Sequence, residues 1–210
     1  NSIPRESSFY NNIPLSVTSL YLSPVYPLEE KVHLHNNIRK LRIGRDIKFI
    51  EKFPDGLKSL HIYTSHYDSL SFVIGKLRKS PDRDNDNDGK KMFLPLPEGL
   101  TCLKFLGNSH LDFDFNLPKY LTKLVFGNGF NKKIPIILPQ FLTKIHFSDE
   151  FNQHIILPVG IKYVRFGSSF NFPIELPNTL IKIVFGDNFN QLLTIHNDIM
   201  EITLGKNFNN

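Results

Sequence analysis

The sequence predicts a mainly β fold: a right-handed solenoid with one parallel sheet, about nine short coils of 19–21 residues and no substantial helix. Three observations carry this prediction. A motif returns at intervals near 20 residues, its centre alternates like a short strand, and prolines interrupt the path from one strand to the next. The composition agrees, because 19 Phe among 210 residues indicate many equivalent core positions.

The repeat is clearest in LPKYLTKLVFGNGFN, from Leu117 to Asn131. Clear copies begin at Leu96, Leu117, Leu138, Leu157, Leu176 and Ile195, with spacings of 21, 21, 19, 19 and 19 residues. Weaker copies begin at Ile13, Leu34 and Phe53. One copy buries almost nothing alone, so we expect nine coils that stack on one another.

Each element of a copy has a local reason. Pro at the second place cannot donate to a strand ladder and disfavours helix before it. The segment Leu-x-x-Leu-x-Phe ends in the alternation of a half-buried strand. Gly at the eleventh place is expected to turn the chain with positive φ. About eight residues then remain for the return path, which is too short for a three-turn helix and should be extended or turn-like.

Stacking predicts columns of like residues. The tenth place gives a core column: Leu22, Ile43, Ile62, Phe105, Phe126, Phe147, Phe166, Phe185 and Leu204. The fourteenth gives a second: Phe130, Phe151, Phe170, Phe189 and Phe208. Beside the second column run Asn131, Asn152, Asn171, Asn190 and Asn209. We expect these Asn side chains to point inward and to bond the backbone of their own turn and of the next coil.

The motif Phe-Asn-x-x-Ile-Pro, as in FNKKIP from Phe130 to Pro135, resembles the FNIP repeat. The near-matches FNFPI and FYNNIP extend the resemblance over nearly the whole chain. This short relative of the leucine-rich repeat is abundant in social amoebae and in giant viruses of amoebae. The resemblance implies a leucine-rich-repeat-like solenoid over residues 1–210, an interaction role and no catalytic residues. No F-box, which sometimes accompanies the repeat, is found in the sequence.

The repeat is interrupted between Phe53 and Leu96, and we expect a polar insertion at about residues 78–91. Its composition favours a solvated loop. A second interpretation is a calcium loop, because Asp84, Asp86 and Asp88 alternate before Gly89. The twelfth place of such a loop should be a bidentate Glu and is Pro95, which removes much of the expected affinity.

The sequence gives no sign of an active site, so we expect a protein that is not an enzyme and needs no cofactor. Its eight His do not cluster with carboxylates or thiols, and Cys102 is the only cysteine and has no designated base. No apolar run is long enough to span a bilayer. The absence of Asn-x-Ser/Thr glycosylation sites favours the cytoplasm, or the host cytoplasm or virion if the protein is viral. The chain starts at Asn1, so we expect a processed product or a fragment.

The seventh and ninth places should form the open face of the sheet. Seven of these 18 residues are Lys or Arg, and Glu201 is the only acid. The chain has a net charge of +5, so part of its basicity lies on one surface. We predict that this face binds a protein partner with an acidic surface, through Lys40, Arg42, Lys104, Lys123, Lys144, His146, Arg165 and Lys182.

Three alternatives stay open. The Lys residues can simply keep an exposed strand soluble. The protein can be an assembly component that self-associates through its coil edges or termini. Nucleic acid ranks below a protein partner, because the aromatic residues lie in the core columns and only Tyr21 and Tyr163 remain for base stacking.

Overall fold

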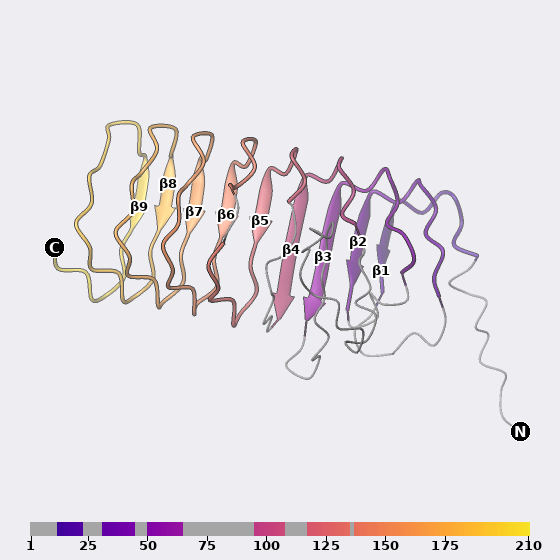
Figure 1. Cartoon of the computed structure of the whole chain (residues 1–210), viewed down its shortest axis with the longest axis horizontal. Coiled ribbons are helices and arrows are strands. Elements are labelled where there is room, and N and C mark those ends of the chain that lie inside the picture. Colours follow the sequence, from indigo (N-terminus) through magenta and orange to yellow (C-terminus); the bar gives the residue numbers. More distant parts are fainter. Residues whose placement is uncertain (1–11, 23–30, 45–49, 65–94, 108–116, 135–136) are drawn as a thin grey trace, which may run out of the picture.

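The computed structural model describes residues 12–22, 31–44, 50–64, 95–107, 117–134 and 137–210. These residues form a solenoid with a single nine-stranded parallel sheet, whose strands follow one another in chain order (Figure 1). The strands are β1 (Ser19–Tyr21), β2 (Lys40–Ile43), β3 (Ser59–Thr64), β4 (Cys102–Gly107), β5 (Lys123–Val125), β6 (Lys144–His146), β7 (Tyr163–Arg165), β8 (Lys182–Val184) and β9 (Glu201–Thr203). The described residues contain no helix, so the predicted fold class is confirmed.

Each coil begins with a turn that its proline closes. The carbonyl of Pro118 accepts a hydrogen bond from the amide of Leu121 at 3.1 Å, and Pro177 accepts from Leu180 at 2.9 Å. Proline suits this place because the turn uses its carbonyl, while its missing N–H is not needed. The same i to i+3 bond recurs where His35 and His196 replace proline. The turn therefore sets the start of every strand.

The core lies between the sheet and the return path, and its centre is a double stack of phenylalanine rings. Phe147 stacks on Phe126 at 5.6 Å and on Phe166 at 4.9 Å between ring centroids. Within the same coil it also stacks on Phe151 at 4.3 Å. Both predicted columns are present, and their inner members are at most 5% exposed. Leu204, in the coil of β9, is 39% exposed because no further described coil covers it.

Apart from Gly107, which has the predicted positive φ, the eleventh-place glycines from Gly127 to Gly205 have a different role from the one predicted. Among the described glycines, positive φ occurs at Gly107 (84°) and at Gly129 (78°), which is not an eleventh-place residue. Elsewhere the constraint is the distance between coils. A Cβ on Gly186 would lie 2.3 Å from the carbonyl oxygen of Gly167, and one on Gly205 would lie 2.3 Å from that of Gly186. These positions require glycine because the backbones of successive coils nearly touch there.

The asparagines form a ladder of hydrogen bonds along the solenoid, but their side chains do not point inward as predicted. Asn131 and Asn171 are exposed, and the Oδ1 atom of each Asn accepts the backbone amide of the Asn in the next coil. These distances are 2.8 Å from Asn131 to Asn152, 3.0 Å from Asn152 to Asn171, 2.9 Å from Asn171 to Asn190 and 3.0 Å from Asn190 to Asn209. The bond to the next coil is thus confirmed. The side chain stays outside because the Phe ring before it fills the interior.

Candidate functional site

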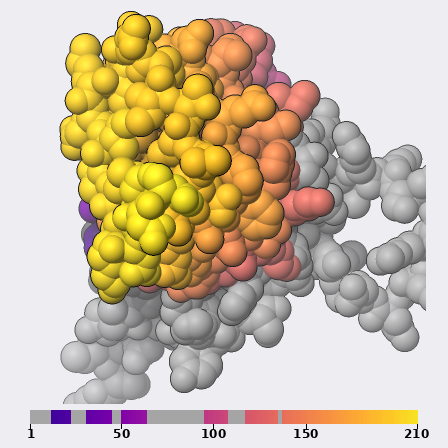
Figure 2. Space-filling model, turned by 90° about the vertical axis from the view of Figure 1, so that its left-hand side faces the viewer, coloured from indigo at the N-terminus to yellow at the C-terminus, as the bar shows by residue number. Residues whose placement is uncertain are grey.

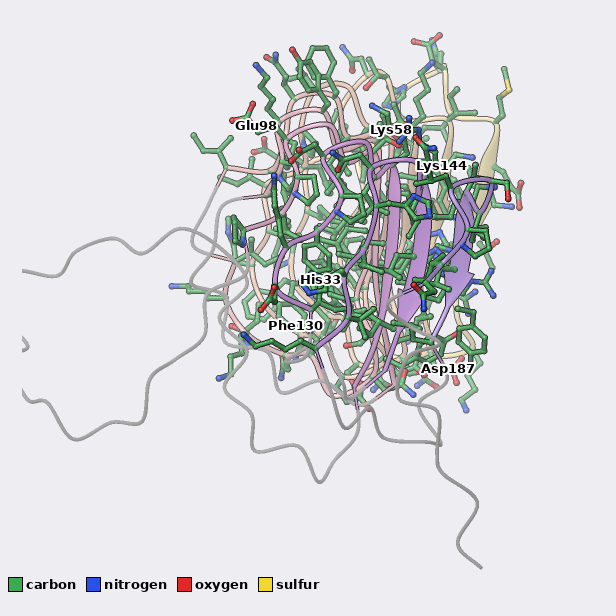
Figure 3. The ribbon with its side chains drawn as sticks, turned by 90° about the vertical axis from the view of Figure 1, so that its right-hand side faces the viewer. His33, Lys58, Glu98, Phe130, Lys144 and Asp187 are labelled. Carbon is green, nitrogen blue, oxygen red and sulfur yellow. The ribbon has the colours of Figure 1, made fainter. Side chains whose placement is uncertain are left out.

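The strand register aligns the two outward columns of the sheet. The seventh places pair in the order Ser19, Lys40, Ser59, Cys102, Lys123, Lys144, Tyr163, Lys182 and Glu201. The ninth places pair as Tyr21, Arg42, His61, Lys104, Val125, His146, Arg165, Val184 and Thr203. We call the surface formed by these two columns the basic face. In Figure 3, which looks along the solenoid from the side of β1, Lys144 lies on the side of the sheet, away from Phe130.

The strands hold these side chains outward because the residue between the two columns is apolar and buried. Leu103, Leu124 and Ile145 each have no exposed surface. Successive residues of a strand point to opposite faces, so a buried eighth place forces the seventh and ninth outward. The eight residues predicted to bind a partner therefore lie on one surface from β2 to β8. Whether they bind a partner stays a prediction.

The charges of the basic face are mostly uncompensated. Lys182 is paired with Glu201 at 2.5 Å, and its ammonium lies 5.8 Å from the centroid of the Tyr163 ring. Within the described part of the chain, no carboxylate pairs with the other six cations, which are Lys40, Arg42, Lys104, Lys123, Lys144 and Arg165. Lys123 and Lys144 are direct partners on neighbouring strands. Like charges in that arrangement destabilise a sheet unless an anion or counterions neutralise them.

Two histidines of the ninth column lie among these cations. His61 is 9% exposed, and Ser59 Oγ is 3.4 Å from its Nε2. His146 is half-buried, and its ring is tilted against that of Tyr163 at 5.0 Å. Burial, and then the charges of nearby Lys and Arg, lower the pKa of each imidazole to about 4. Both are therefore neutral near pH 7.

The basic face is hollowed over β1 to β3. A hollow of about 350 Å³ is lined by residues that include Tyr21, Lys40, Arg42 and His61. The ring of Tyr21 lies 6.3 Å from that of Tyr63. Two of the residues that line the hollow, Lys40 and Arg42, pair with no carboxylate among the described residues.

The return side of the solenoid carries an apolar surface that the sequence analysis did not find. Ile137, Ile156, Val159 and Leu192 are 98%, 78%, 80% and 82% exposed. Two adjoining hollows of about 430 and 880 Å³ share the segment from His154 to Leu157 in their walls. Spacing gave no signal, because return segments differ in length between copies. The sequence signal for this surface is the presence of large apolar residues at places of the repeat that the core pattern does not use.

The remaining candidate chemistry is sparse. Among the described residues, no group of three His, Cys, Asp or Glu side chains could hold a metal ion. The described chain also includes no helix with the length and hydropathy of a membrane span. Cys102 is partly exposed on the basic face between Ser59 and Lys123. The calcium candidates Asp84, Asp86 and Asp88 and the insertion at 78–91 lie outside the described residues.

Comparison with known proteins agrees with the fold. A family model described as FNIP repeat matches residues 130–169 and 170–197. The chain is also similar to CroV588, a circular leucine-rich-repeat protein of a giant virus, with 23% identity and a TM-score of 0.52. That match covers 95% of this chain but 38% of CroV588, so the chain spans well under half the length of its neighbour. No curated protein matches the chain.

The predicted resemblance to the FNIP repeat is therefore confirmed over residues 130–197, the part of the chain that the family model matches. The predicted leucine-rich-repeat-like solenoid is confirmed by the neighbouring structure. Proteins of this repeat type are generally scaffolds without catalytic activity.

Proposed function

We propose that this FNIP-repeat solenoid is a non-enzymatic interaction module whose basic face binds a protein partner with an acidic surface. The observation that carries the proposal is the alignment of seven Lys and Arg side chains on one sheet face, where Glu201 is the only acid. Solenoids commonly bind partners along such an extended surface.

Charge repulsion on the free face supports an anionic partner. Neighbouring strands lie ~4.8 Å apart, so Lys123 and Lys144 crowd each other on adjacent strands. Arg165 follows one strand further along in the ninth column. A partner that brings carboxylates to these positions removes repulsion that the free protein bears, and it also gains electrostatic steering.

A protein fits this face better than a nucleic acid. Sequence-independent binding of single-stranded nucleic acid uses a series of exposed aromatic rings. The outward columns hold only Tyr21 and Tyr163, and both already contact neighbours, Tyr63 and His146 respectively. The Phe rings that would otherwise stack on bases fill the core.

The test compares two triple variants with the same change in charge. In the first, Lys123, Lys144 and Arg165 become Glu. In the second, Lys119, Lys133 and Lys162, which lie off the outward columns, become Glu. Binding of a fluorescent oligoaspartate peptide is measured at several salt concentrations, with oligothymidylate of equal charge as the second probe.

We expect the first variant to keep its melting temperature and to bind oligoaspartate at least about tenfold more weakly, with a smaller dependence on salt. The second variant should bind within about twofold of the parent, because none of its three charges lies in the seventh or ninth column. Equal losses in both variants would mean that net charge alone governs binding. Tighter binding of oligothymidylate than of oligoaspartate would favour nucleic acid.

A second candidate function is assembly through the coil that carries β9. Leu204 and Ile195 of this coil are 39% and 55% exposed, whereas their counterparts Phe185 and Leu157 are 2% and 6% exposed. Figure 2 shows this coil as the face of the solenoid that is turned to the viewer. A second copy stacked there would bury these residues.

The assembly candidate predicts an oligomer whose mass, measured by light scattering, falls to that of one chain in Leu204→Lys. The Lys123, Lys144 and Arg165 variant should leave that oligomer unchanged. The interaction module predicts instead that oligoaspartate binding falls in the Lys123, Lys144 and Arg165 variant and is unchanged in Leu204→Lys. The same set of proteins therefore separates the two functions.

A further inference from the structure

His146 lies at the centre of the largest group of uncompensated cations on the basic face. Its neighbour in the ninth column on β7 is Arg165, and on β5 it is Val125. Lys123 on β5 and Lys144 on its own strand lie in the seventh column, with Tyr163 following on β7. Lys104 on β4 is the next charge along the ninth column. These charged and titratable groups face the imidazole from every strand packed near it, and none is a carboxylate.

The group of unpaired cations ends at β8, where Glu201 supplies the carboxylate of the basic face. Lys182 on β8 is the next cation of the seventh column, and Glu201 neutralises it. An incoming anion therefore finds its strongest field over β5 to β7, around His146, rather than over β8. The Tyr163 ring packs against the imidazole from one side, at 5.0 Å between ring centroids, and so restricts its orientation.

We propose that an acidic partner places a carboxylate beside His146, among Lys123, Lys144 and Arg165, and that docking is coupled to uptake of a proton by this imidazole. The inference depends on the proposed function, since it assigns the regulation of the same face. Without a partner, the surrounding cations and the partial burial keep the ring neutral. A carboxylate at hydrogen-bond distance reverses that field and stabilises the imidazolium.

The coupling has a definite sign. The pKa of His146 in the free protein is about 4. If the docked carboxylate returns this pKa to the ordinary value of about 6.5, linkage makes binding about tenfold tighter at about pH 5.5 than at about pH 7.5. The carboxylates of an aspartate-rich partner stay ionised over that window, because their ordinary pKa is about 3.9.

The experiment uses the full chain and the fluorescent oligoaspartate peptide at about pH 7.5 and about pH 5.5. The parent should bind about tenfold more tightly at the lower pH. His146→Gln removes the titrating imidazole, so its affinity for the peptide should differ by less than about twofold between the two pH values. His154→Gln, on the return side, removes an exposed imidazole and should keep the effect.

The ring C–H resonances of His146, identified by their loss in His146→Gln, give a direct measure by NMR. They should titrate near pH 4 in the free protein and at about pH 6.5 when the peptide is saturating. An unchanged titration, or an equal pH effect in His146→Gln and the parent, would overturn the coupling and leave the acidic partner in place. Failure of the parent to bind the peptide at either pH would overturn the proposed function, and this inference with it.

Discussion

Replacement of Phe147 by Ala tests whether the phenylalanine stack supports the solenoid. Phe147 is 5% exposed, and three other rings pack against it with centroid distances of 4.3 to 5.6 Å. Its coil lies in the middle of the array, so the cavity would open between two coils on either side. Each of those coils contacts mainly its own neighbours, so the surroundings have few ways to collapse into the space.

The expected loss is ~3–5 kcal/mol of the free energy of unfolding, as for other Phe→Ala changes in packed cores. Each ring pair adds about 0.5–1.5 kcal/mol beyond the area it buries, which favours the upper half of that range. For a chain of this length the loss corresponds to roughly 6–20 °C in melting temperature. Phe141→Ala is the matched control, because Phe141 is 47% exposed and, within the described part of the chain, stacks on Tyr120 alone, at 5.8 Å between ring centroids. Its expected loss is about 1 kcal/mol or less.

The assay is urea unfolding followed by circular dichroism, together with hydrogen exchange of the amides in β5 and β7. Exchange is needed because a solenoid can open from one side of a damaged coil. We expect protection to fall on both sides of the coil of β6 in Phe147→Ala. A loss below about 1 kcal/mol, or one equal to that of Phe141→Ala, would refute the view that the stacked rings hold the coils together.

Three further predictions follow from close contacts and pKa values. Gly186→Ala should lower the free energy of unfolding by ~1–3 kcal/mol, because its Cβ would lie 2.3 Å from a backbone carbonyl. Gly99→Ala should lower it less, because its Cβ would lie 3.2 Å from the flexible ammonium of Lys58, and urea unfolding compares the two variants. Asn171→Ala should lower the free energy of unfolding by ~0.5–1.5 kcal/mol and speed hydrogen exchange of the Asn190 amide, which donates to Asn171 Oδ1. Asn171→Asp keeps an acceptor oxygen and should cost less. Without a partner, the melting temperature should fall as the pH drops from about 6.5 to about 4. The reason is that His61 and His146 have a pKa of about 4 in the folded chain, so the unfolded chain binds their protons more readily. The double His→Gln variant should show a smaller fall, and an equal fall would place the effect elsewhere.

The outward columns were predictable because two rules fix them. The spacing of the copies sets the register, and the two-residue period of a strand sets which side each residue faces. Lys123, Lys144 and Arg165 therefore lie where the pattern predicts. The pairing of Lys182 with Glu201 was also within reach, since the two occupy the same place in adjacent copies.

Distances between coils were not predictable from one sequence. Glycine at the eleventh place suggested a turn with positive φ, but Gly186 is constrained by the neighbouring backbone. Asn131 was expected inside, yet the ring of Phe130 takes that space and the amide stays at the surface. The apolar return surface around Ile156 was missed because the return segments share no strict pattern.

The pairing of β3 with β4 has a consequence for how the chain could be divided. This ladder has six residue pairs, whereas the other ladders have three or four. It also joins strands whose paired residues are 43 positions apart, compared with 19 or 21 elsewhere, so its closure costs the most chain entropy. The longest ladder thus joins the two neighbouring strands that are separated by the greatest length of chain. If the chain were divided into two polypeptides between β3 and β4, every other strand ladder would stay within one polypeptide. The two polypeptides would then associate through the β3–β4 ladder.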